Sequence, residues 1–441
     1  MSIFKAYDIR GVYPKELNEE IAYNIGKAFA DFVNVRKILV GRDMRLSSDS
    51  LFRSLSRGII EQGSDVINIG MCSSPMCNFA CNFLKADASV MITASHNPKE
   101  YNGFKFTRKQ AIPISEDTGI RDIEDLFNKN KFRKSKKKGR IIRKEIMKGY
   151  VKHVLKFIKN KNAKLKIIVD CGNGMGGPET REVFRHLKCK LTEMYFKPDG
   201  NFPNHEANPL KEENVKELRE KVIQQKADLG IAMDGDADRV FFISDKGEII
   251  PSDFITCLIA KTYLKEKQGE TILYDLRSSW ITPETIKKNG GIPVMSKVGH
   301  SFIKEKLRKA KGIFGGELSG HFYFKDNFYT DSGIIASMKI IGLVTEEKKK
   351  ISELIKPLKK YFASGEINSE VKDKEAKMKE LAKKYKNGRI SWLDGIRIEF
   401  DDWWFNVRPS NTEPLLRLNL EAKTKELMEK KRDEILRIIR S

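Results

Sequence analysis

Three aspartates stand at alternate positions in the segment Asp234-Gly235-Asp236-Ala237-Asp238-Arg239. Because only small residues separate them, their carboxylates can converge on one hard cation through oxygen ligands. A calcium hand needs glycine at its sixth position, where this segment has Arg239, so the pattern favours Mg²⁺. Without a cation the three charges would repel one another on an acidic turn, which is the alternative interpretation. Beside a bound metal, Arg239 would suit a phosphoryl oxygen.

A serine stands at a strand-to-turn junction in the segment Thr93-Ala94-Ser95-His96-Asn97-Pro98. The Asn-Pro turn that follows presents Ser95 for nucleophilic attack or for carrying a transferred group. A Ser-His-Asp hydrolase is disfavoured, because the adjacent side chains of Ser95 and His96 do not easily form the required hydrogen bond. An ordinary Asn-Pro turn with an incidental serine is the alternative.

A glycine-rich segment, Gly315-Gly316-Glu317-Leu318-Ser319-Gly320-His321, offers three polar side chains to a ligand. Its glycines allow close backbone approach, and Glu317, Ser319 and His321 carry hydrogen-bonding groups suited to a polyol. Upstream, His300 stands at a predicted helix start. Imidazole titrates near neutrality, so His300 and His321 are candidate proton-transfer groups. The alternative is a glycine-rich turn whose polar side chains face solvent.

The segment Arg408-Pro409-Ser410-Asn411-Thr412-Glu413-Pro414 concentrates hydrogen-bond donors. One guanidinium, the hydroxyls of Ser410 and Thr412 and the amide of Asn411 make a compact donor set for a phosphate. An ordinary turn between two strands would explain the same residues.

These segments require elements that hold them at one edge of a sheet. Short apolar strands are predicted at residues 38–43, 167–172 and 272–275, and a second set at 90–92, 229–233 and 313–316. Helical patterns at residues 48–62, 178–187 and 302–309 lie between them. Alternating strands and amphipathic helices indicate α/β layers with buried sheets, whose function concentrates at the carboxyl ends of the strands. The first three polar segments all follow a strand of the second set.

The last part of the chain differs from the rest. Strands are predicted near residues 390–400, 403–407 and 415–420, and a helix closes the chain at 427–439. Strands gathered between helices indicate a smaller α+β domain. We therefore expect three related α/β domains, at residues 1–145, 146–248 and 249–360, and an α+β domain at 361–441.

The chain has 441 residues and a formal net charge of +23, from 83 lysines and arginines against 60 aspartates and glutamates. Hydrophobic residues make up 40%, which excludes a disordered polyelectrolyte and a membrane-embedded chain. The densest basic stretch, residues 129–144, is predicted to be a solvated surface segment. No basic stripe alternates with aromatics and no zinc-finger spacing or RNA-recognition motif occurs, so no specific nucleic-acid partner is predicted.

The sequence predicts a cytoplasmic protein with no membrane partner. No apolar run reaches the roughly 18 residues that a spanning helix needs. Residues 1–8 lack the basic and apolar regions of a signal peptide. The six cysteines lack the density of a disulfide scaffold, which fits a reducing compartment. A monomer and a small homo-oligomer are both compatible with the sequence.

Taken in order, the four polar segments resemble the α-D-phosphohexomutase family, of the phosphomannomutase/phosphoglucomutase type. The resemblance runs from Tyr7-Asp8-Ile9-Arg10-Gly11 to the segment that begins at Arg408, and it includes Asn201-Phe202-Pro203-Asn204-His205. It implies four domains around a central cleft, three of them with a related α/β core of mixed sheets and the last an α+β domain.

The resemblance also implies a mechanism. Ser95 would carry a phosphoryl group, give it to a hexose phosphate and regain one from the resulting hexose 1,6-bisphosphate, which also serves as activator. Mg²⁺ would be held by Asp234, Asp236 and Asp238 and by the phosphoserine. The residues implied to flank Ser95, or to bind the sugar and its non-reacting phosphate, are Tyr7, Arg10, Lys105, Arg239, Arg277, Glu317, Ser319, Arg408, Ser410, Asn411 and Thr412.

In related mutases, the loop that holds Glu317 varies with the sugar. The triplet Glu317-Leu318-Ser319 resembles the Glu-Met-Ser of glucose and mannose enzymes, whereas phosphoglucosamine mutases more often carry Glu-Gln-Ser. Those enzymes also tend to have Ser-Gly-Thr where this chain has Ser410-Asn411-Thr412. The resemblance therefore implies a phosphate of mannose, of glucose or of both as the small phosphosugar substrate. The alternatives are a phosphoglucosamine mutase and a non-catalytic phosphosugar-binding protein of the same fold.

Overall fold

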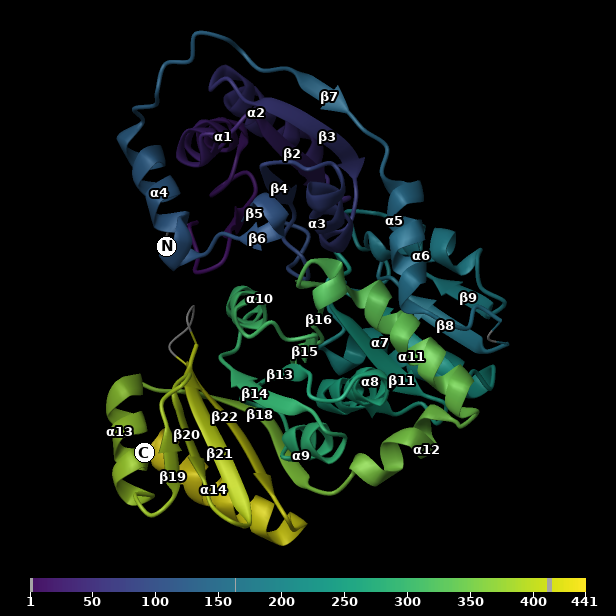
Figure 1. The fold of residues 1–441 in the computed structure, drawn as a ribbon. Helices are drawn as coiled ribbons and strands as arrows, with labels where there is room; N and C mark the ends of the chain where they lie inside the picture. The colour runs from purple at the N-terminus through teal and green to yellow at the C-terminus, as the bar shows by residue number, and fades with distance from the viewer. Residues whose placement is uncertain (1–2, 163, 411–414) are drawn as a thin grey trace.

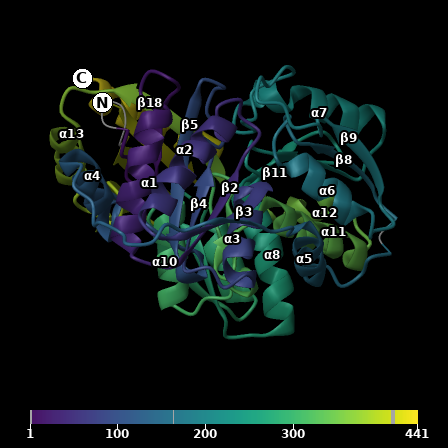
Figure 2. The ribbon, with the colours of Figure 1, turned by 90° about the horizontal axis from the view of Figure 1, so that it is seen from above.

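The computed structural model describes residues 3–162, 164–410 and 415–441. These residues form four β-sheets, each built from its own stretch of chain, with helices packed around them (Figure 1). Seen from above, the purple and blue elements of the first sheet lie beside the teal elements of the second (Figure 2). The expected architecture of three α/β layers and a separate C-terminal α+β domain is confirmed.

The first sheet contains seven strands in the order β1-β5-β4-β2-β3-β7, with β6 attached to β5. Strand β2 runs parallel to β3 and β4, β7 joins β3 in parallel, and β5 is antiparallel to β1 and β4. Its strands are β1 (Ile9–Val12), β2 (Lys37–Arg42), β3 (Asp65–Met71), β4 (Ala88–Ile92), β5 (Tyr101–Arg108), β6 (Ile112–Pro113) and β7 (Ile141–Arg143). Its helices are α1 (Glu19–Val33), α2 (Ser48–Glu61), α3 (Ser74–Phe83) and α4 (Ile120–Lys129).

The basic stretch at residues 129–144 is largely exposed, as the sequence predicts, and part of it forms a strand that was not predicted. Strand β7 pairs in parallel with β3 at the edge of the first sheet. Ile141 and Arg143 are exposed, so β7 is held by backbone hydrogen bonds rather than by a buried face. Three residues without a buried face are too short a pattern to predict a strand from the sequence.

The second and third sheets have five strands each, in the orders β12-β11-β10-β8-β9 and β14-β13-β15-β16-β17. The second region consists of α5 (Met147–Val154), β8 (Lys166–Asp170), α6 (Gly176–Phe184), β9 (Lys190–Met194), α7 (Glu212–Gln224), β10 (Leu229–Met233), β11 (Val240–Ser244) and β12 (Ile249–Ile250). The third consists of α8 (Ser252–Glu266), β13 (Thr271–Asp275), α9 (Ile281–Lys288), β14 (Ile292–Ser296), α10 (His300–Lys309), β15 (Phe314–Gly316), β16 (Phe322–Phe324), β17 (Thr330–Asp331), α11 (Gly333–Glu347) and α12 (Ile351–Ile355).

One pairing pattern recurs in these three sheets. In each, a central strand (β4, β10 or β15) runs parallel to an earlier strand and antiparallel to the strand that follows it. The segments that begin at Ser95, Asp234 and Glu317 connect the central strand to that antiparallel neighbour. The three predicted chemical loops therefore occupy the same place in three related sheets.

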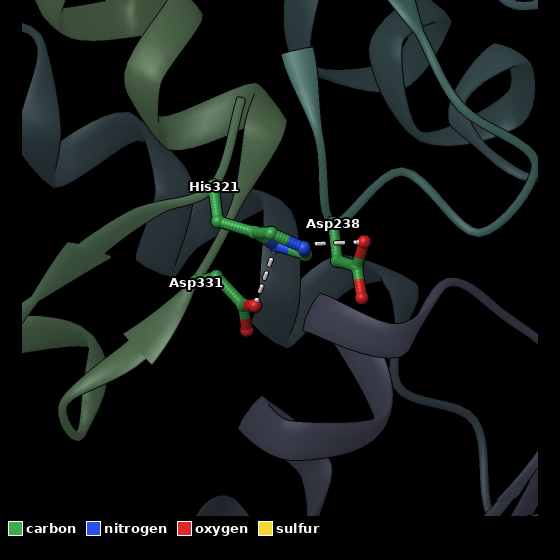
Figure 3. A group of neighbouring side chains, drawn as sticks. All are labelled: Asp238, His321 and Asp331. Carbon is green, nitrogen blue, oxygen red and sulfur yellow. Dashed lines mark ion pairs between the residues drawn. The ribbon is translucent and has the colours of Figure 1, made fainter. Parts of the chain in front are cut away.

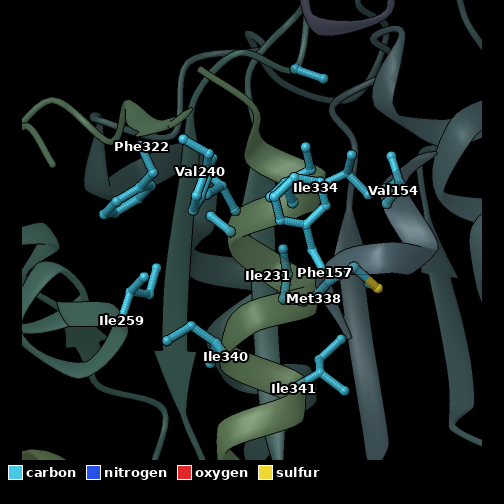
Figure 4. Close-up of a cluster of buried hydrophobic side chains, with 14 of the residues drawn as sticks. Val154, Phe157, Ile231, Val240, Ile259, Phe322, Ile334, Met338, Ile340 and Ile341 are labelled. Carbon is cyan, nitrogen blue, oxygen red and sulfur yellow. The ribbon is translucent and has the colours of Figure 1, made fainter. Parts of the chain in front are cut away.

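A continuous hydrophobic core joins the second and third sheets and extends to the first. Helix α11 lies at its centre, with Ile334, Met338, Ile340 and Ile341 packed against the strands and helices around it (Figure 4). Since α11 is apolar on nearly every side, it is buried rather than amphipathic. This shared core gives the loops of these three sheets a common support.

The C-terminal sheet is entirely antiparallel, in the order β18-β22-β21-β20-β19, and has its own core. Its elements are β18 (Phe362–Glu370), α13 (Lys374–Lys384), β19 (Arg389–Ser391), β20 (Ile396–Glu399), β21 (Trp403–Pro409), β22 (Leu415–Ala422) and α14 (Lys425–Arg440). We propose domain divisions near residues 145, 248 and 360, with β12 carrying the second sheet on to Ile250. Among the described residues, every helix is too short or too polar to cross a membrane.

Candidate active site

Ser95 lies between β4 and β5, with its backbone in the left-handed region at φ 50°. The amide of Ser95 donates a hydrogen bond to Thr93 Oγ1 at 2.9 Å. Its hydroxyl donates to Asp234 Oδ2 at 2.8 Å. A serine in this conformation is uncommon, and here it aims the hydroxyl at the loop after β10. The predicted serine and metal loops therefore meet.

The imidazole of His96 lies within hydrogen-bonding distance of the Ser95 hydroxyl, contrary to the prediction from the sequence. His96 Nδ1 lies 3.2 Å from Ser95 Oγ, so the argument that these adjacent side chains do not easily hydrogen-bond is wrong. The left-handed turn brings them together. Burial, with Arg239 and Arg10 nearby, lowers the pKa of His96 well below its ordinary value. Asp234 accepts from the serine rather than from the imidazole, so these residues do not form the relay of a serine hydrolase.

The three aspartates converge as their spacing predicts. Asp234, Asp236 and Asp238 are buried, and each offers a carboxylate oxygen within 4.8 Å of those of the other two. Within the described chain, Asp236 Oδ1 and Asp238 Oδ1 are buried without a hydrogen-bond partner. Orphaned carboxylate oxygens are unfavourable in a protein interior unless a cation pairs with them. This donor set fits a divalent metal such as Mg²⁺, which prefers oxygen ligands.

Lys105, on β5, bridges two of these aspartates. Its Nζ lies 2.6 Å from Asp236 Oδ2 and 2.8 Å from Asp238 Oδ2. Burial alone would lower the pKa of Lys105, but the two carboxylates outweigh burial and raise that pKa above its usual range. By contrast, burial and the carboxylates of Asp238 and Asp236 raise the pKa of Asp234. Lys105 is thus held as a fixed positive charge beside the predicted metal site.

His321 is held between two carboxylates (Figure 3). Its Nδ1 lies 2.9 Å from Asp331 Oδ2 and 3.7 Å from Asp238 Oδ1. Lys304 Nζ lies 2.7 Å from the other oxygen of Asp331. Burial alone would raise the pKa of Asp331, but Lys304 and His321 outweigh it and hold that pKa below its usual range. An ionised Asp331 can therefore fix the orientation of the imidazole, a role that no sequence motif around Asp331 indicated.

His300 begins α10, directly after Gly299. Gly299 has φ 124°, and a Cβ there would lie 2.9 Å from Tyr7 Oη, so the close approach of this loop to Tyr7 requires glycine. The ring centroid of His300 is 5.6 Å from that of Tyr7 and 6.0 Å from that of His321. Burial, with Lys304 nearby, lowers the pKa of His300 well below its ordinary value. Burial and the Asp394 carboxylate raise the pKa of Tyr7 to about 12.

Two arginines support the serine loop. Arg10, which the family resemblance implies as a neighbour of Ser95, donates hydrogen bonds of 2.5 Å to Asn97 Oδ1 and to Asp8 Oδ2. Arg45, which no motif in the sequence indicated, is buried in the connection between β2 and α2. It donates hydrogen bonds to four backbone carbonyls around Ser95. The guanidinium of Arg45 also lies 3.3 Å from the buried Asp43. Arg45 follows the first predicted strand by a few residues, but no composition signal marks it as a support of a distant loop.

The glycine-rich loop holds Glu317 rigidly. Glu317 Oε1 accepts a hydrogen bond from the Gly299 amide at 3.1 Å, and Oε2 accepts one from Tyr323 Oη at 2.8 Å. The amide of Leu318 donates to Asp275 Oδ2 at 2.6 Å. In the described part of the chain, the buried hydroxyl of Ser319 has no hydrogen-bond partner. Glu317 and Ser319 therefore present polar oxygens from a fixed backbone.

An arginine cluster lies where the third and fourth sheets meet. Arg277 forms a two-point pair with Asp275, at 3.1 and 2.9 Å. Arg408, at the end of β21, and Arg417, on β22, both contact Glu366 of β18, at 3.0 and 3.3 Å. The predicted turn residue Arg408 thus lies within a strand, because β21 continues to Pro409. Neither Glu366 nor Arg417 carries a sequence signal of its role.

One cleft of about 450 Å³ brings most of these groups together. It is lined by residues from all four sheet regions, among them Tyr7, His96, Arg239, Arg277, His300, Glu317, Ser319, His321, Glu366, Arg408 and Arg417. Ser95 and the aspartates adjoin it through His96 and His321. Ser410 is buried and accepts from Arg417 at 3.4 Å, whereas Asn411 and Thr412 lie outside the described residues. These groups suit phosphoryl transfer to or from a polyol.

Comparison with known proteins identifies the family. Family models described as phosphoglucomutase/phosphomannomutase, alpha/beta/alpha domains I, II and III, match residues 1–134, 148–247 and 251–361. The model of the C-terminal domain of the same family matches residues 366–438. The chain belongs to the phosphoglucomutase/phosphomannomutase family.

Individual relatives agree over nearly the whole chain. A phosphomannomutase of Escherichia coli (strain K12) is 41% identical over 434 residues, which cover 96% of this chain and 95% of the relative. A phosphomannomutase of Methanocaldococcus jannaschii is 41% identical over 445 residues, covering 100% and 98%. The crystal structure of a phosphoglucomutase/phosphomannomutase family protein from Burkholderia thailandensis is similar with a TM-score of 0.92 at 32% identity, covering 99% of this chain and 96% of that one. The chain is accordingly an enzyme, a mutase of the isomerase class that transfers phosphoryl groups on hexose phosphates.

Proposed function

We propose that this enzyme reversibly interconverts the 1- and 6-phosphates of mannose, of glucose or of both, through a phosphoserine at Ser95 and a hexose 1,6-bisphosphate. The observation that carries the proposal is the contact of Ser95 Oγ with Asp234 Oδ2 at 2.8 Å, at the edge of the cleft. This contact supports the proposal because a hydroxyl of the type that can carry a phosphoryl group lies beside three carboxylates that could hold a divalent metal.

The reaction consists of two transfers of opposite sense. First, the bond from phosphorus to Ser95 Oγ breaks and a bond to the O6 hydroxyl of the hexose 1-phosphate forms. The sugar hydroxyl loses its proton and Ser95 gains one, giving the 1,6-bisphosphate. The bisphosphate then turns round, and its C1 phosphoryl group returns to Ser95 with the opposite proton movement. Hexose 6-phosphate leaves, the phosphoserine is restored, and no water is consumed.

The residues around Ser95 supply charge and move protons. Lys105 forms an ion pair with Asp236, and Arg10 donates a hydrogen bond to Asn97 in the serine loop, so both hold positive charge near Ser95. His300 and His321 line the cleft and can take the proton of the sugar hydroxyl and return it. The residues that would hold Mg²⁺ are Asp234, Asp236, Asp238 and Ser95. When bound, the ion would neutralise the charge of the transferring phosphoryl oxygens.

The opposite side of the cleft binds the rest of the substrate. Glu317 and Ser319 accept or donate hydrogen bonds to sugar hydroxyls from a fixed backbone. Arg408 and Ser410, with the predicted phosphate ligands Asn411 and Thr412, hold the non-reacting phosphate. Tyr7, Arg239 and Arg277 line the same cleft and complete the predicted substrate site.

The test of the phosphoserine is the Ser95→Ala variant. We expect it to lose at least about a thousandfold in kcat, because no other step supplies the phosphoryl group. Mass spectrometry after incubation with glucose 1,6-bisphosphate should find phosphate on Ser95 in the parent enzyme. Ser54→Ala, on α2 and outside the cleft, is the matched control and should keep normal turnover. Near-normal turnover of Ser95→Ala would refute the mechanism.

The sugar is tested by assaying mannose, glucose and glucosamine 1-phosphates side by side. The relatives described above are named phosphomannomutase, which supports mannose. We expect the mannose or the glucose substrate to have the highest kcat/KM and glucosamine 1-phosphate the lowest. A preference for glucosamine 1-phosphate would assign the enzyme to the alternative sugar while leaving the phosphoserine chemistry intact.

A further inference from the structure

A bulge in β18 aims Glu366 into the cleft. The register of β18 against β22 shifts between Ala363, which pairs with Glu421, and Glu366, which pairs with Asn419. This stretch of β18 therefore has one residue more than the stretch of β22 opposite it. Gly365 supplies the bend, with φ 68°. Such bulges redirect a side chain and are enriched next to active sites. The strand is therefore built to place this one carboxylate on the cleft side of the sheet.

The Glu366 carboxylate touches three guanidinium groups. Its Oε2 lies 3.0 Å from Arg408 and 3.6 Å from Arg277, and its Oε1 lies 3.3 Å from Arg417. Burial alone would raise the pKa of Glu366, but these arginines, with Arg408 first, outweigh it and lower that pKa. The carboxylate is thus ionised at neutral pH. Its side chain is 28% exposed, so a ligand in the cleft can reach the same groups.

Glu366 changes the charge that a phosphate meets. Arg277 is also paired with Asp275, and Arg408 is the cation that acts most strongly on Glu366, so Arg408 is the charge that Glu366 chiefly offsets. Carboxylates and phosphates bind guanidinium groups in the same planar geometry. A phosphate that approaches Arg408 therefore competes with Glu366 for the same donors.

We propose that Glu366 is a built-in competitor of the substrate phosphate: it occupies Arg408 and Arg417 in the ligand-free cleft, yields to the non-reacting phosphate, and limits how tightly that phosphate is held. This role rests on the proposed function, in which a bisphosphate must release both phosphates and bind again reversed. A cluster with uncompensated arginines would hold the intermediate too long to turn round. Glu366 is a positioning residue, because it acts through the arginines.

The experiment compares Glu366→Gln with the parent chain. Binding of mannose 6-phosphate, and separately of inorganic phosphate, is measured by calorimetry with both chains in the Ser95→Ala background, where turnover cannot interfere. We expect Glu366→Gln to bind each about 3- to 10-fold more tightly, because a competing negative charge is removed. In the Ser95 enzyme, KM should fall by a similar factor and kcat should fall with it, as release slows.

The matched control is Glu429→Gln, which removes the same charge from a half-exposed position on α14, far from Glu366 in the sequence. Its dissociation constants should stay within twofold of the parent values. Unchanged or weaker binding by Glu366→Gln would overturn the proposal, because the carboxylate would then only hold the arginines in place. If Glu366→Gln does not fold, Glu366→Asp replaces it. The shorter side chain of aspartate reaches Arg408 less well, so this variant should bind each ligand about twofold more tightly. Weaker binding would again overturn the proposal.

These measurements separate the two claims. Failure of the mutase assay together with tighter phosphosugar binding by Glu366→Gln would refute the proposed function and leave the competition by Glu366 standing. Normal mutase activity combined with unchanged binding by Glu366→Gln would refute the competition and leave the function standing.

Discussion

Arg45→Lys should lower kcat about 100-fold while leaving the charge of the protein unchanged, because Arg45 holds the turn that presents Ser95. The Arg45 guanidinium donates to four carbonyl oxygens, those of Pro98 at 2.7 Å, Tyr101 at 2.9 Å, Ser95 at 2.8 Å and Asn97 at 2.6 Å. It also pairs with Asp43, and both side chains are almost fully buried. A single planar fork thus fixes the backbone before and after the serine.

The magnitude follows from what lysine cannot replace. Its ammonium has three donors on one atom and no planar fork, so it serves at most two of the carbonyls while staying near Asp43. Two carbonyls left without a donor in a buried site cost about 1 kcal/mol or more each. We therefore expect the free energy of unfolding to fall by about 2–3 kcal/mol. A shift of the Ser95 turn by about 1 Å would lower kcat about 100-fold.

The assay is kcat for hexose phosphate interconversion, with denaturant unfolding as the measure of stability. Arg53→Lys, an exposed arginine on α2, is the control and should change the free energy of unfolding by less than about 0.5 kcal/mol. Phosphorylation of Ser95 by glucose 1,6-bisphosphate should slow in parallel with turnover. If Arg45→Lys loses the expected stability but keeps full kcat, the frame around Ser95 does not position the serine and the reasoning is refuted.

Two further variants test other buried charges. Asp331→Asn should lower kcat about 10- to 100-fold with less than threefold change in KM, because it removes the carboxylate that orients His321. Asp326→Asn, at an exposed position in the short 3-10 helix Lys325–Asn327, is the control and should change neither value. A large rise in KM for Asp331→Asn would contradict the orienting role. Glu179→Gln tests pH dependence: burial raises the pKa of Glu179 from 4.5 to about 7, so stability is lost as pH rises through that interval. Denaturant unfolding should find this variant about 1–3 kcal/mol more stable than the parent at pH 8 and nearly equal at pH 5; equal stability at pH 8 would contradict it.

The loops were predictable because their chemistry is local in the sequence. Asp234, Asp236 and Asp238 converge through their own alternate spacing, and Ser95 is presented by the turn in which it stands. The fold class was predictable for a similar reason: buried central strands are continuous apolar runs, as at Leu229–Met233. These features need no knowledge of distant contacts.

The residues that the sequence did not reveal act on partners far along the chain. Arg45 reaches carbonyls around Ser95, and Glu366 reaches Arg277 across the junction of two sheets. A lone arginine or glutamate carries no pattern that distinguishes such a role from that of a surface charge. Strand β7 was missed because its pairing depends on backbone groups, and the contact of Ser95 with His96 because a positive φ is not visible in residue types.

Cations of the cleft and of the serine and aspartate loops beside it are already paired with carboxylates of the chain in the ligand-free structure. The pairs are Arg10 with Asp8, Lys105 with Asp236, Arg277 with Asp275 and Arg408 with Glu366. Unpaired, such partly buried charges would cost several kcal/mol each in stability. A phosphosugar with about −1.5 to −2 charges on each phosphate therefore exchanges with existing partners rather than entering a vacant positive pocket. Exchange of one anion for another changes the free energy less than capture by free cations. This suits the proposed reaction, in which a bisphosphate would leave both phosphate positions and bind them again in reverse.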